Sequence, residues 1–116
     1  MHIIEDDRSV RDAARELVRG AGREVFVYDS PHSFFAGPPI GPKDIVLLDL
    51  HFPVGSGVET AQRVKQDAPG ARIIILSGIR GAPYARALAA IAPAASFRKP
   101  IDGDALIACI EHLAAS

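Results

Sequence analysis

Two runs of four consecutive apolar residues constrain the fold of this chain more than any other feature of its sequence. They are Ile45-Val46-Leu47-Leu48 and Ile73-Ile74-Ile75-Leu76. Because successive side chains of a strand point to opposite faces, a run that is apolar at every position predicts a strand buried on both sides. Such strands lie at the centre of a parallel sheet covered by helices, so the two runs predict an α/β fold.

The rest of the chain alternates short strand-like runs with helical patterns. Further strands are predicted at residues 2–4, 25–28 and 95–98. Helices are predicted over residues 9–19, 58–68 and 82–90, with a short one opened by Pro31 and a last one capped by Asp102. Five β-α units joined by right-handed crossovers imply one parallel sheet with helices on both faces.

Length and composition exclude several classes of protein. The chain has 116 residues, which fits one domain over residues 1–116 and leaves no room for a visible output domain. A net charge of −1 argues against direct nucleic-acid binding and against an anionic membrane surface. The single cysteine, Cys109, excludes an internal disulfide, and no apolar run approaches a membrane span. We therefore expect a cytoplasmic domain that binds neither membrane nor nucleic acid.

Polar side chains follow four of the predicted strands. Glu5 and Asp6 follow the first strand, Asp49 the third, Ser77 the fourth and Lys99 the fifth. In open parallel sheets, sites form at the edge where the strands have their carboxyl ends. Clustered carboxylates repel one another and partly protonate unless a cation neutralises them, and hard oxygen ligands suit Mg²⁺. Such a site suits phosphoryl transfer to Asp49, with the metal, Lys99 and the Ser77 hydroxyl holding the phosphoryl oxygens.

Four segments, taken in order, resemble the receiver domain of two-component response regulators. They are residues 3–7, residues 46–53 with Gly57 after them, residues 74–78 and residues 97–101. The resemblance covers essentially the whole chain. It implies a flavodoxin-like three-layer sandwich of five β-α units with sheet order 2-1-3-4-5. It also implies a cis bond between Lys99 and Pro100.

The resemblance also implies a role for each residue of the site. Asp49 corresponds to the phosphoacceptor, which receives its phosphoryl group from a histidine kinase or a phosphotransfer protein. Glu5, Asp6, Asp49 and the backbone carbonyl of His51 correspond to the Mg²⁺ site, with Asp6 a closer ligand than Glu5. Ser77 corresponds to the switch hydroxyl and Lys99 to the family's lysine. The resemblance therefore predicts a phosphorelay protein rather than a classical enzyme.

The sequence departs from the family pattern at the position three residues before Lys99. An aromatic side chain usually stands there, but this chain has Ser96, and Phe97 comes one residue later. Because adjacent strand residues point to opposite faces, Phe97 is predicted to belong to the core rather than to the switch. A half-buried Tyr84 without a signalling role is expected on the fourth helix. The sequence therefore does not supply the usual aromatic coupling between the site and the surface at this position.

Residues near the phosphoacceptor are expected to modulate its chemistry. His51 and Ile79 occupy variable positions two residues after Asp49 and Ser77, and Gly78 lies between Ser77 and Ile79. The His51 imidazole either shields the acyl phosphate, orients water or is simply exposed. The large apolar side chain of Ile79 is expected to hinder water and lengthen the life of the phosphoryl group.

Other charged residues have a structural interpretation. His2 and His112 lack metal-ligand spacing and are predicted at the surface or at an edge, and His32 is expected to be exposed at a helix start. Six charged residues of the first helix are interpreted as a solvated face: Arg8, Arg11, Asp12, Arg15, Glu16 and Arg19.

The functional hypothesis is a phosphorylatable switch that changes protein contacts. The surface of the fourth helix, fifth strand and fifth helix is expected to hold a downstream partner, and the alanine-rich fourth helix makes a homodimer a further expectation. An alternative is a receiver-like interaction module that no longer cycles by phosphorylation. A small phosphatase is a weaker alternative, because that chemistry needs a second aspartate where His51 stands.

Overall fold

The predicted alternation of strands and helices is present in the computed structural model, which describes residues 1–51 and 54–115. The strands are β1 (His2–Ile4), β2 (Phe26–Tyr28), β3 (Ile45–Leu50), β4 (Arg72–Ser77) and β5 (Ala95–Arg98). The helices are α1 (Arg8–Gly20), α2 (Pro31–Ala36), α3 (Val54–Asp67), α4 (Ala82–Ile91) and α5 (Gly103–Ala114). Phe52 and Pro53, which belong to the segment after Asp49, lie outside the described residues.

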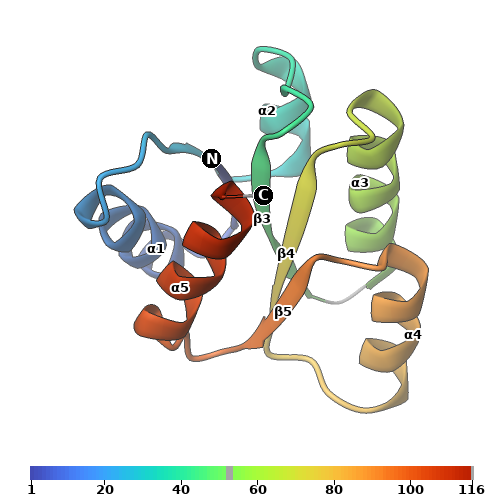
Figure 1. Ribbon diagram of the computed structural model, residues 1–116. Coiled ribbons are helices and arrows are strands. Elements are labelled where there is room, and N and C mark those ends of the chain that lie inside the picture. The colour runs from blue at the N-terminus through green and yellow to red at the C-terminus, as the bar shows by residue number, and fades with distance from the viewer. Residues whose placement is uncertain (52–53, 116) are drawn as a thin grey trace.

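The five strands form one parallel sheet in the order β2-β1-β3-β4-β5. Helices α1 and α5 lie on one face of the sheet, and α2, α3 and α4 lie on the other (Figure 1). The register pairs Ile4 of β1 with Leu48 of β3, and Leu50 of β3 with Ser77 of β4. This arrangement confirms the predicted flavodoxin-like sandwich and brings the carboxyl ends of β1, β3 and β4 to one edge.

The two apolar runs alternate between two separate cores, as the sequence predicts. Val46, Leu48, Ile73 and Ile75 pack with the helices of the α2–α3–α4 face. Ile45, Leu47, Ile74 and Leu76 pack with α1 and α5 on the other face. All eight side chains are at most 5% exposed. Burial on both faces holds β3 and β4 in one register, because a slip of one residue would exchange the two faces.

Side chains placed just before the helices satisfy their first free backbone N–H groups. The Asp7 carboxylate accepts from the Val10 amide at 3.2 Å at the start of α1. The Ser30 hydroxyl accepts from the Ser33 amide at 3.1 Å, and the Asp102 carboxylate accepts from the Ala105 amide at 3.1 Å. These caps fix where α1, α2 and α5 begin relative to the carboxyl edge of the sheet.

Helix α3 packs unusually closely on β3. A Cβ atom at Gly57 would lie 2.4 Å from Cδ1 of Leu50, the residue that follows Asp49. Gly57 is therefore explained by the close approach of helix and strand rather than by a phosphate-binding loop. The absence of a side chain at Gly57 lets α3 lie directly against the end of β3, beside the candidate site.

His2 is buried, which corrects the prediction that it lies at the surface. The residue is 7% exposed, and its ring stacks on Phe26 and Tyr28 and meets Phe34 edge-on. The prediction fails because β1 is an inner strand, lying between β2 and β3, where its first residue is covered. His32 and His112 are exposed, as predicted. None of the described helices has the length and apolar character needed to cross a membrane.

Candidate functional site

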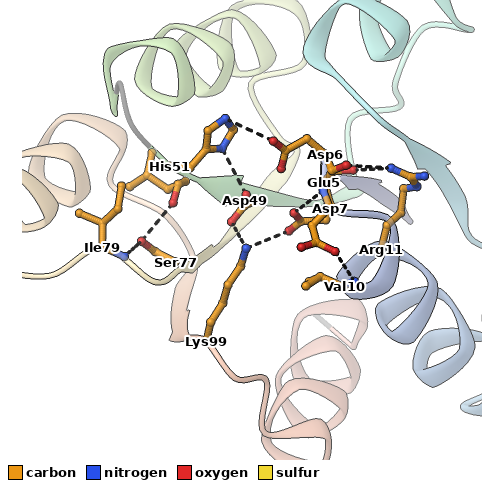
Figure 2. A network of polar contacts seen from close by, with 11 residues as sticks. Glu5, Asp6, Asp7, Val10, Arg11, Asp49, His51, Ser77, Ile79 and Lys99 are labelled. Carbon is orange, nitrogen blue, oxygen red and sulfur yellow. Dashed lines mark hydrogen bonds and ion pairs between the residues drawn. The ribbon is translucent and has the colours of Figure 1, made fainter.

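The strand ends deliver the predicted polar residues to one place (Figure 2). Glu5 and Asp6 follow β1, Asp49 is the penultimate residue of β3, Ser77 ends β4 and Lys99 follows β5. The Lys99 amide donates to the Ser77 carbonyl at 2.9 Å, which ties the end of β5 to the end of β4. The Lys99–Pro100 bond is cis, as the resemblance predicts. Residues up to 94 positions apart in the chain therefore share one edge of the sheet.

Lys99 joins the two most buried carboxylates. Its Nζ lies 2.8 Å from Oδ1 of Asp49 and 3.4 Å from Oε2 of Glu5. Burial alone would lower the pKa of the Lys99 ammonium, but the hydrogen bond and charge of Asp49, together with the charge of Glu5, outweigh it and raise the pKa. The lysine is therefore held as a cation between two carboxylates.

Glu5 is the innermost acid of the site. It is 2% exposed, and its Oε1 accepts from the Asp7 amide at 3.0 Å. Burial raises the pKa of Glu5 from 4.5 to about 7, and the charge of Asp49 adds to the rise, while the Asp7 amide and Lys99 oppose it. This carboxyl group therefore ionises less readily than an exposed glutamate even with Lys99 beside it.

His51 lies between two carboxylates, a position that sequence reasoning left open. Its Nδ1 is 3.2 Å from Oδ2 of Asp49 and its Nε2 is 3.9 Å from Oδ2 of Asp6. The His51 side chain is 52% exposed and that of Asp6 is 61% exposed, so this part of the site is open. The sequence offers one signal for this contact. His51 follows Asp49 by two residues, and residues i and i+2 of an extended segment point to the same face.

Ser77 reaches the site, but its hydroxyl is bonded elsewhere. The Oγ–H donates to the Leu50 carbonyl at 3.2 Å, and Oγ accepts from the Ile79 amide at 2.8 Å. Ser77 is fully buried and Ile79 is 9% exposed, whereas Gly78 between them is exposed. The hydroxyl therefore links the end of β3 to the segment that leads into α4.

Arg11 contributes to the site although the sequence placed it on a solvated helix face. Its Nη1 donates to the Glu5 carbonyl at 2.9 Å and lies 3.4 Å from the Asp6 carbonyl. The guanidinium thus holds the backbone that carries both acidic residues (Figure 2). Arg11 follows Asp6 by five residues and Glu5 by six, and this spacing indicates a contact only once the turn into α1 is known.

Ser96 and Phe97 lie as the strand alternation predicts. Ser96 is exposed, and its partner in the register is Ile75, which belongs to the core under α2, α3 and α4. Phe97 is half-buried against the core under α1 and α5. Tyr84 is partly buried against the α2–α3–α4 core. Phe97, which pairs with Leu76 in the sheet, therefore lies on the other face from Ser96.

The donor set fits a divalent cation. Ligand atoms of Asp6, Asp49 and His51 lie within 4.8 Å of one another. A cavity of about 150 Å³ opens beside them and is lined by Glu5, Asp6, Asp29, Asp49 and His51 among others. Asp49 Oδ1 and Glu5 Oε2 face the Lys99 ammonium, at 2.8 Å and 3.4 Å, whereas Asp49 Oδ2 lies on the side of His51. Carboxylate oxygens that line an open cavity are suited to a hard cation such as Mg²⁺.

Comparison with known proteins then places the chain in a family. A model of the response regulator receiver domain matches residues 1–111. The chain belongs to this family. Receiver domains are the phosphoacceptor modules of two-component signalling rather than classical enzymes.

Individual relatives agree with the family. Transcriptional regulatory protein FixJ of Bradyrhizobium diazoefficiens is 28% identical over 111 residues, which are 96% of this chain and 54% of that protein. Response regulator protein TodT of Pseudomonas putida is 26% identical over 110 residues, 95% of this chain and 48% of that protein. The receiver domain thus spans about half the length of these relatives.

Solved structures show the same fold. A response regulator receiver protein from Burkholderia phymatum has a TM-score of 0.79 at 27% identity, covering 98% of this chain and 93% of that one. The BeF3-activated receiver domain of DrrB has a TM-score of 0.85 at 19% identity, covering 99% of this chain and 96% of that one. The receiver-domain sheet and its five helices are therefore shared at low sequence identity.

Proposed function

We propose that this receiver domain is a phosphorylatable switch with Asp49 as its phosphoacceptor. The observation that carries the proposal is the placement of Asp49, a 5% exposed carboxylate that contacts the Lys99 ammonium at 2.8 Å beside an open cavity. A carboxylate needs no general base to act as a nucleophile at neutral pH. The phosphoryl donor is a histidine kinase or a phosphotransfer protein.

The reaction is a transfer of one phosphoryl group. An Asp49 carboxylate oxygen forms a bond to phosphorus as the nitrogen–phosphorus bond of the donor phosphohistidine breaks. The bonding pair stays on the imidazole nitrogen, which then takes a proton from solvent. Lys99 remains charged and balances the negative charge on the transferred group, which is the main task of a site for phosphoryl transfer.

Mg²⁺ is the proposed cofactor. Asp6, Asp49 and the backbone carbonyl of His51 would hold it, with buried Glu5 adding negative charge behind Lys99. When bound, it neutralises charge on the phosphoryl oxygens. Arg11 keeps the backbone of Glu5 and Asp6 in place for this role.

Ser77 is the proposed link between phosphorylation and shape. To reach a phosphoryl oxygen on Asp49, its hydroxyl must leave the Leu50 carbonyl and release the Ile79 amide. Phosphorylation then favours the conformation in which Ser77 has turned, because only that conformation gains the new hydrogen bond. Ile79, at the lip of the site, is proposed to hinder water.

The output is a change in protein contacts. The proposed surface is made by α4, β5 and α5, where several small apolar side chains of α4 are exposed: Ala85, Ala89 and Ala90. A downstream protein or a second copy of the domain would bind there. We assign this domain no contact with nucleic acid or membrane, and we place the reaction in the cytoplasm, where kinases draw on ATP.

The test is phosphorylation by a small donor. Wild-type protein, Asp49→Asn and Asp29→Asn are incubated with Mg²⁺ and acetyl phosphate, and intact mass is measured. Asp29 lines the same cavity and serves as a matched control. We expect one added phosphoryl group on wild type and on Asp29→Asn and none on Asp49→Asn. An adduct on Asp49→Asn, or none on wild type, would contradict the proposal.

A second candidate function follows from Ser96. Because Ser96 is exposed and Phe97 is packed in the opposite core, the domain lacks the aromatic side chain expected to follow Ser77. A receiver-like module that binds its partner without cycling has no need of that side chain. Failure of wild type to take up a phosphoryl group or to bind beryllofluoride would favour this function.

A further inference from the structure

Lys65 holds the carboxyl end of a helix other than its own. It lies in the last turn of α3, and its Nζ donates to the Ile91 carbonyl and, at 3.1 Å, to the Ala92 carbonyl at the end of α4. The last carbonyls of a helix have no partner within the helix and carry partial negative charge. Because α4 has no basic residue in its own last turn, the Lys65 ammonium supplies both the hydrogen-bond donor and the positive charge that this end lacks.

The backbone of Ala92 is a second sign that this end of α4 is fixed. Ala92 has a φ of 48°, a left-handed conformation that is unfavourable for a residue with a Cβ atom. Such a conformation persists where the surrounding structure holds it. The neighbouring side chain of Ile91 is fully buried in the core under α2, α3 and α4. The carboxyl end of α4 is therefore anchored by packing and by Lys65.

The amino end of α4 depends on contacts of a different kind. Gly81 precedes the helix with a φ of 81° and provides no side-chain cap. Further back, the Ile79 amide donates to Oγ of Ser77 at 2.8 Å (Figure 2). Gly78 and Gly81 lie on either side of Ile79, and glycine adopts a wide range of backbone angles at little cost. In the proposed switch, the turn of Ser77 removes the acceptor of the Ile79 amide and releases this end of α4.

The two ends together determine how α4 can move. A hydrogen-bonded helix is stiffer than the glycine-containing segment before it, so α4 moves as one body. With one end anchored and the other released, such a body swings about its anchored end. The displacement is then largest around Tyr84 and Ala85 in the first half of α4, and smallest at Ile91. Because Ala85 is exposed, the swing changes the surface that is proposed to bind the partner.

We propose that Lys65 is a positioning residue that couples the turn of Ser77 to a swing of α4. This inference rests on the proposed function, because the phosphoryl group on Asp49 is what turns Ser77. It gives the chain a route from the site to the surface through the backbone of residues 77–81. This route needs no aromatic ring at position 96, which fits the exposed Ser96 found there.

The response of α4 to beryllofluoride tests the coupling. Backbone amide resonances of α4 are recorded in the presence of Mg²⁺, before and after beryllofluoride is added, in wild type, Lys65→Met and Lys65→Arg. Lys43→Met replaces an exposed lysine just before β3 and is the matched control.

We expect the resonances of wild type and Lys43→Met to shift mainly in the first half of α4. Lys65→Met should still bind beryllofluoride but lose this difference between the two halves, because its α4 has no charged anchor. Lys65→Arg keeps the charge and the donors and should respond as wild type does. The same difference between the halves in Lys65→Met as in wild type would overturn the proposal.

Hydrogen exchange of the unmodified protein measures the anchor itself. The amides of residues 88–92 should exchange about fivefold faster or more in Lys65→Met than in wild type, because the end of α4 opens more often. Lys65→Gln keeps a donor without the charge and should lie between the two. It takes the place of Lys65→Met in both measurements if that variant does not fold. Equal exchange in wild type and Lys65→Met would also overturn the proposal.

Intact mass after treatment with acetyl phosphate separates this inference from the preceding proposal. If wild type and Lys65→Met both take up a phosphoryl group and α4 responds alike in both, the role of Lys65 fails and the phosphoacceptor role of Asp49 stands. If wild type takes up no phosphoryl group, the switch fails and the coupling fails with it.

Discussion

The molecule contains two histidine–aspartate pairs at opposite ends of its sheet. They share the same two residue types but differ in burial and in hydrogen bonding. His2 and Asp44 lie at the amino ends of β1 and β3, with Nε2 of His2 3.0 Å from Oδ2 of Asp44. His51 and Asp49 lie at the carboxyl end of β3, with a similar separation of 3.2 Å. The surroundings decide what each pair can do.

The pair at the amino end is closed. The second ring nitrogen of His2 bonds the Tyr28 hydroxyl at 3.3 Å, and Asp44 accepts from the Gly41 amide at 2.8 Å. Burial raises the pKa of the Asp44 carboxyl, but the Gly41 amide and His2 outweigh it and lower the pKa. Each donor has its acceptor, so this pair holds β1, β2 and the start of β3 together.

The pair at the carboxyl end is open. The His51 side chain is 52% exposed, whereas that of His2 is 9% exposed. The second ring nitrogen of His51 lies 3.9 Å from Asp6, which is too far for a hydrogen bond. The comparison teaches that burial and completeness of hydrogen bonding, not residue type, distinguish a closed pair from one that stays accessible to a ligand.

The largest expected effect comes from removing the positive charge of Lys99 at the open, carboxyl end of the sheet. In Lys99→Ala, the charge on the phosphoryl group is no longer balanced, so the rate of phosphorylation by acetyl phosphate should fall about 10²-fold or more. Intact mass measured against time gives the rate. Lys43→Ala, an exposed lysine beside Asp44 at the other end, is the control and should keep the wild-type rate. Equal rates in both variants would remove Lys99 from the chemistry.

When stability is measured instead of activity, the variant at the closed, amino end of the sheet should show the larger effect. His2→Ala removes a buried ring and two hydrogen bonds, and should lower the free energy of unfolding by about 2–4 kcal/mol. His51→Ala, at a half-exposed position, should lower it by less than about 0.5 kcal/mol. Urea denaturation followed by circular dichroism measures both. A comparable loss in the two variants would show that the closed and open pairs do not differ as described.

The raised pKa of Glu5, at the open end, predicts that the stability of the folded chain depends on pH. Because this pKa is about 7 in the folded chain and 4.5 in the reference state, the unfolded chain loses the proton first as pH rises. In magnesium-free buffer, the stability of wild type relative to Glu5→Gln should therefore fall by about 1–3 kcal/mol between roughly pH 5 and pH 8. Thermal unfolding of both proteins across this range is the measurement. Glu59→Gln, at an exposed position of α3, should show no such trend.

The smallest effect is expected at the lip of the open end. Replacing Ile79 with alanine removes a nearly buried apolar side chain beside Ser77, so water should reach the phosphoryl group more easily. The half-life of the adduct on Asp49 should shorten by about two- to fivefold, an effect of roughly 1 kcal/mol or less on the barrier. Decay of the adduct, followed by mass after removal of acetyl phosphate, gives the half-life. A longer half-life in Ile79→Ala would contradict the shielding role.

The sequence predicts the sheet well because the relevant signals are local. Apolar residues at every position of 45–48 and 73–76 require two covered faces, and the alternation with helices then leaves few topologies. The meeting of Glu5, Asp49 and Lys99 follows from the same topology, because each comes at a strand end. Their roles in phosphorylation and metal binding remain predictions.

The parts that sequence reasoning missed depend on contacts between distant elements. The burial of His2 comes from β2 and α2 folding over the start of β1, and no property of residues 1–4 indicates it. The contact of Arg11 with two carbonyls depends on the turn from β1 into α1. The ring of His51 and the hydroxyl of Ser77 each have several partners within reach along the sequence. Only the packing of the folded chain determines which partner each one contacts.

The two hydrogen bonds of the Ser77 hydroxyl determine how rarely an unphosphorylated domain would adopt the turned conformation. Turning the hydroxyl toward Asp49 gives up the bonds to Leu50 and Ile79 at once, a loss of about 1 kcal/mol for each neutral bond. A difference of about 2 kcal/mol leaves the turned form at roughly 3% of molecules at equilibrium. This latch would therefore fix the background level of signalling.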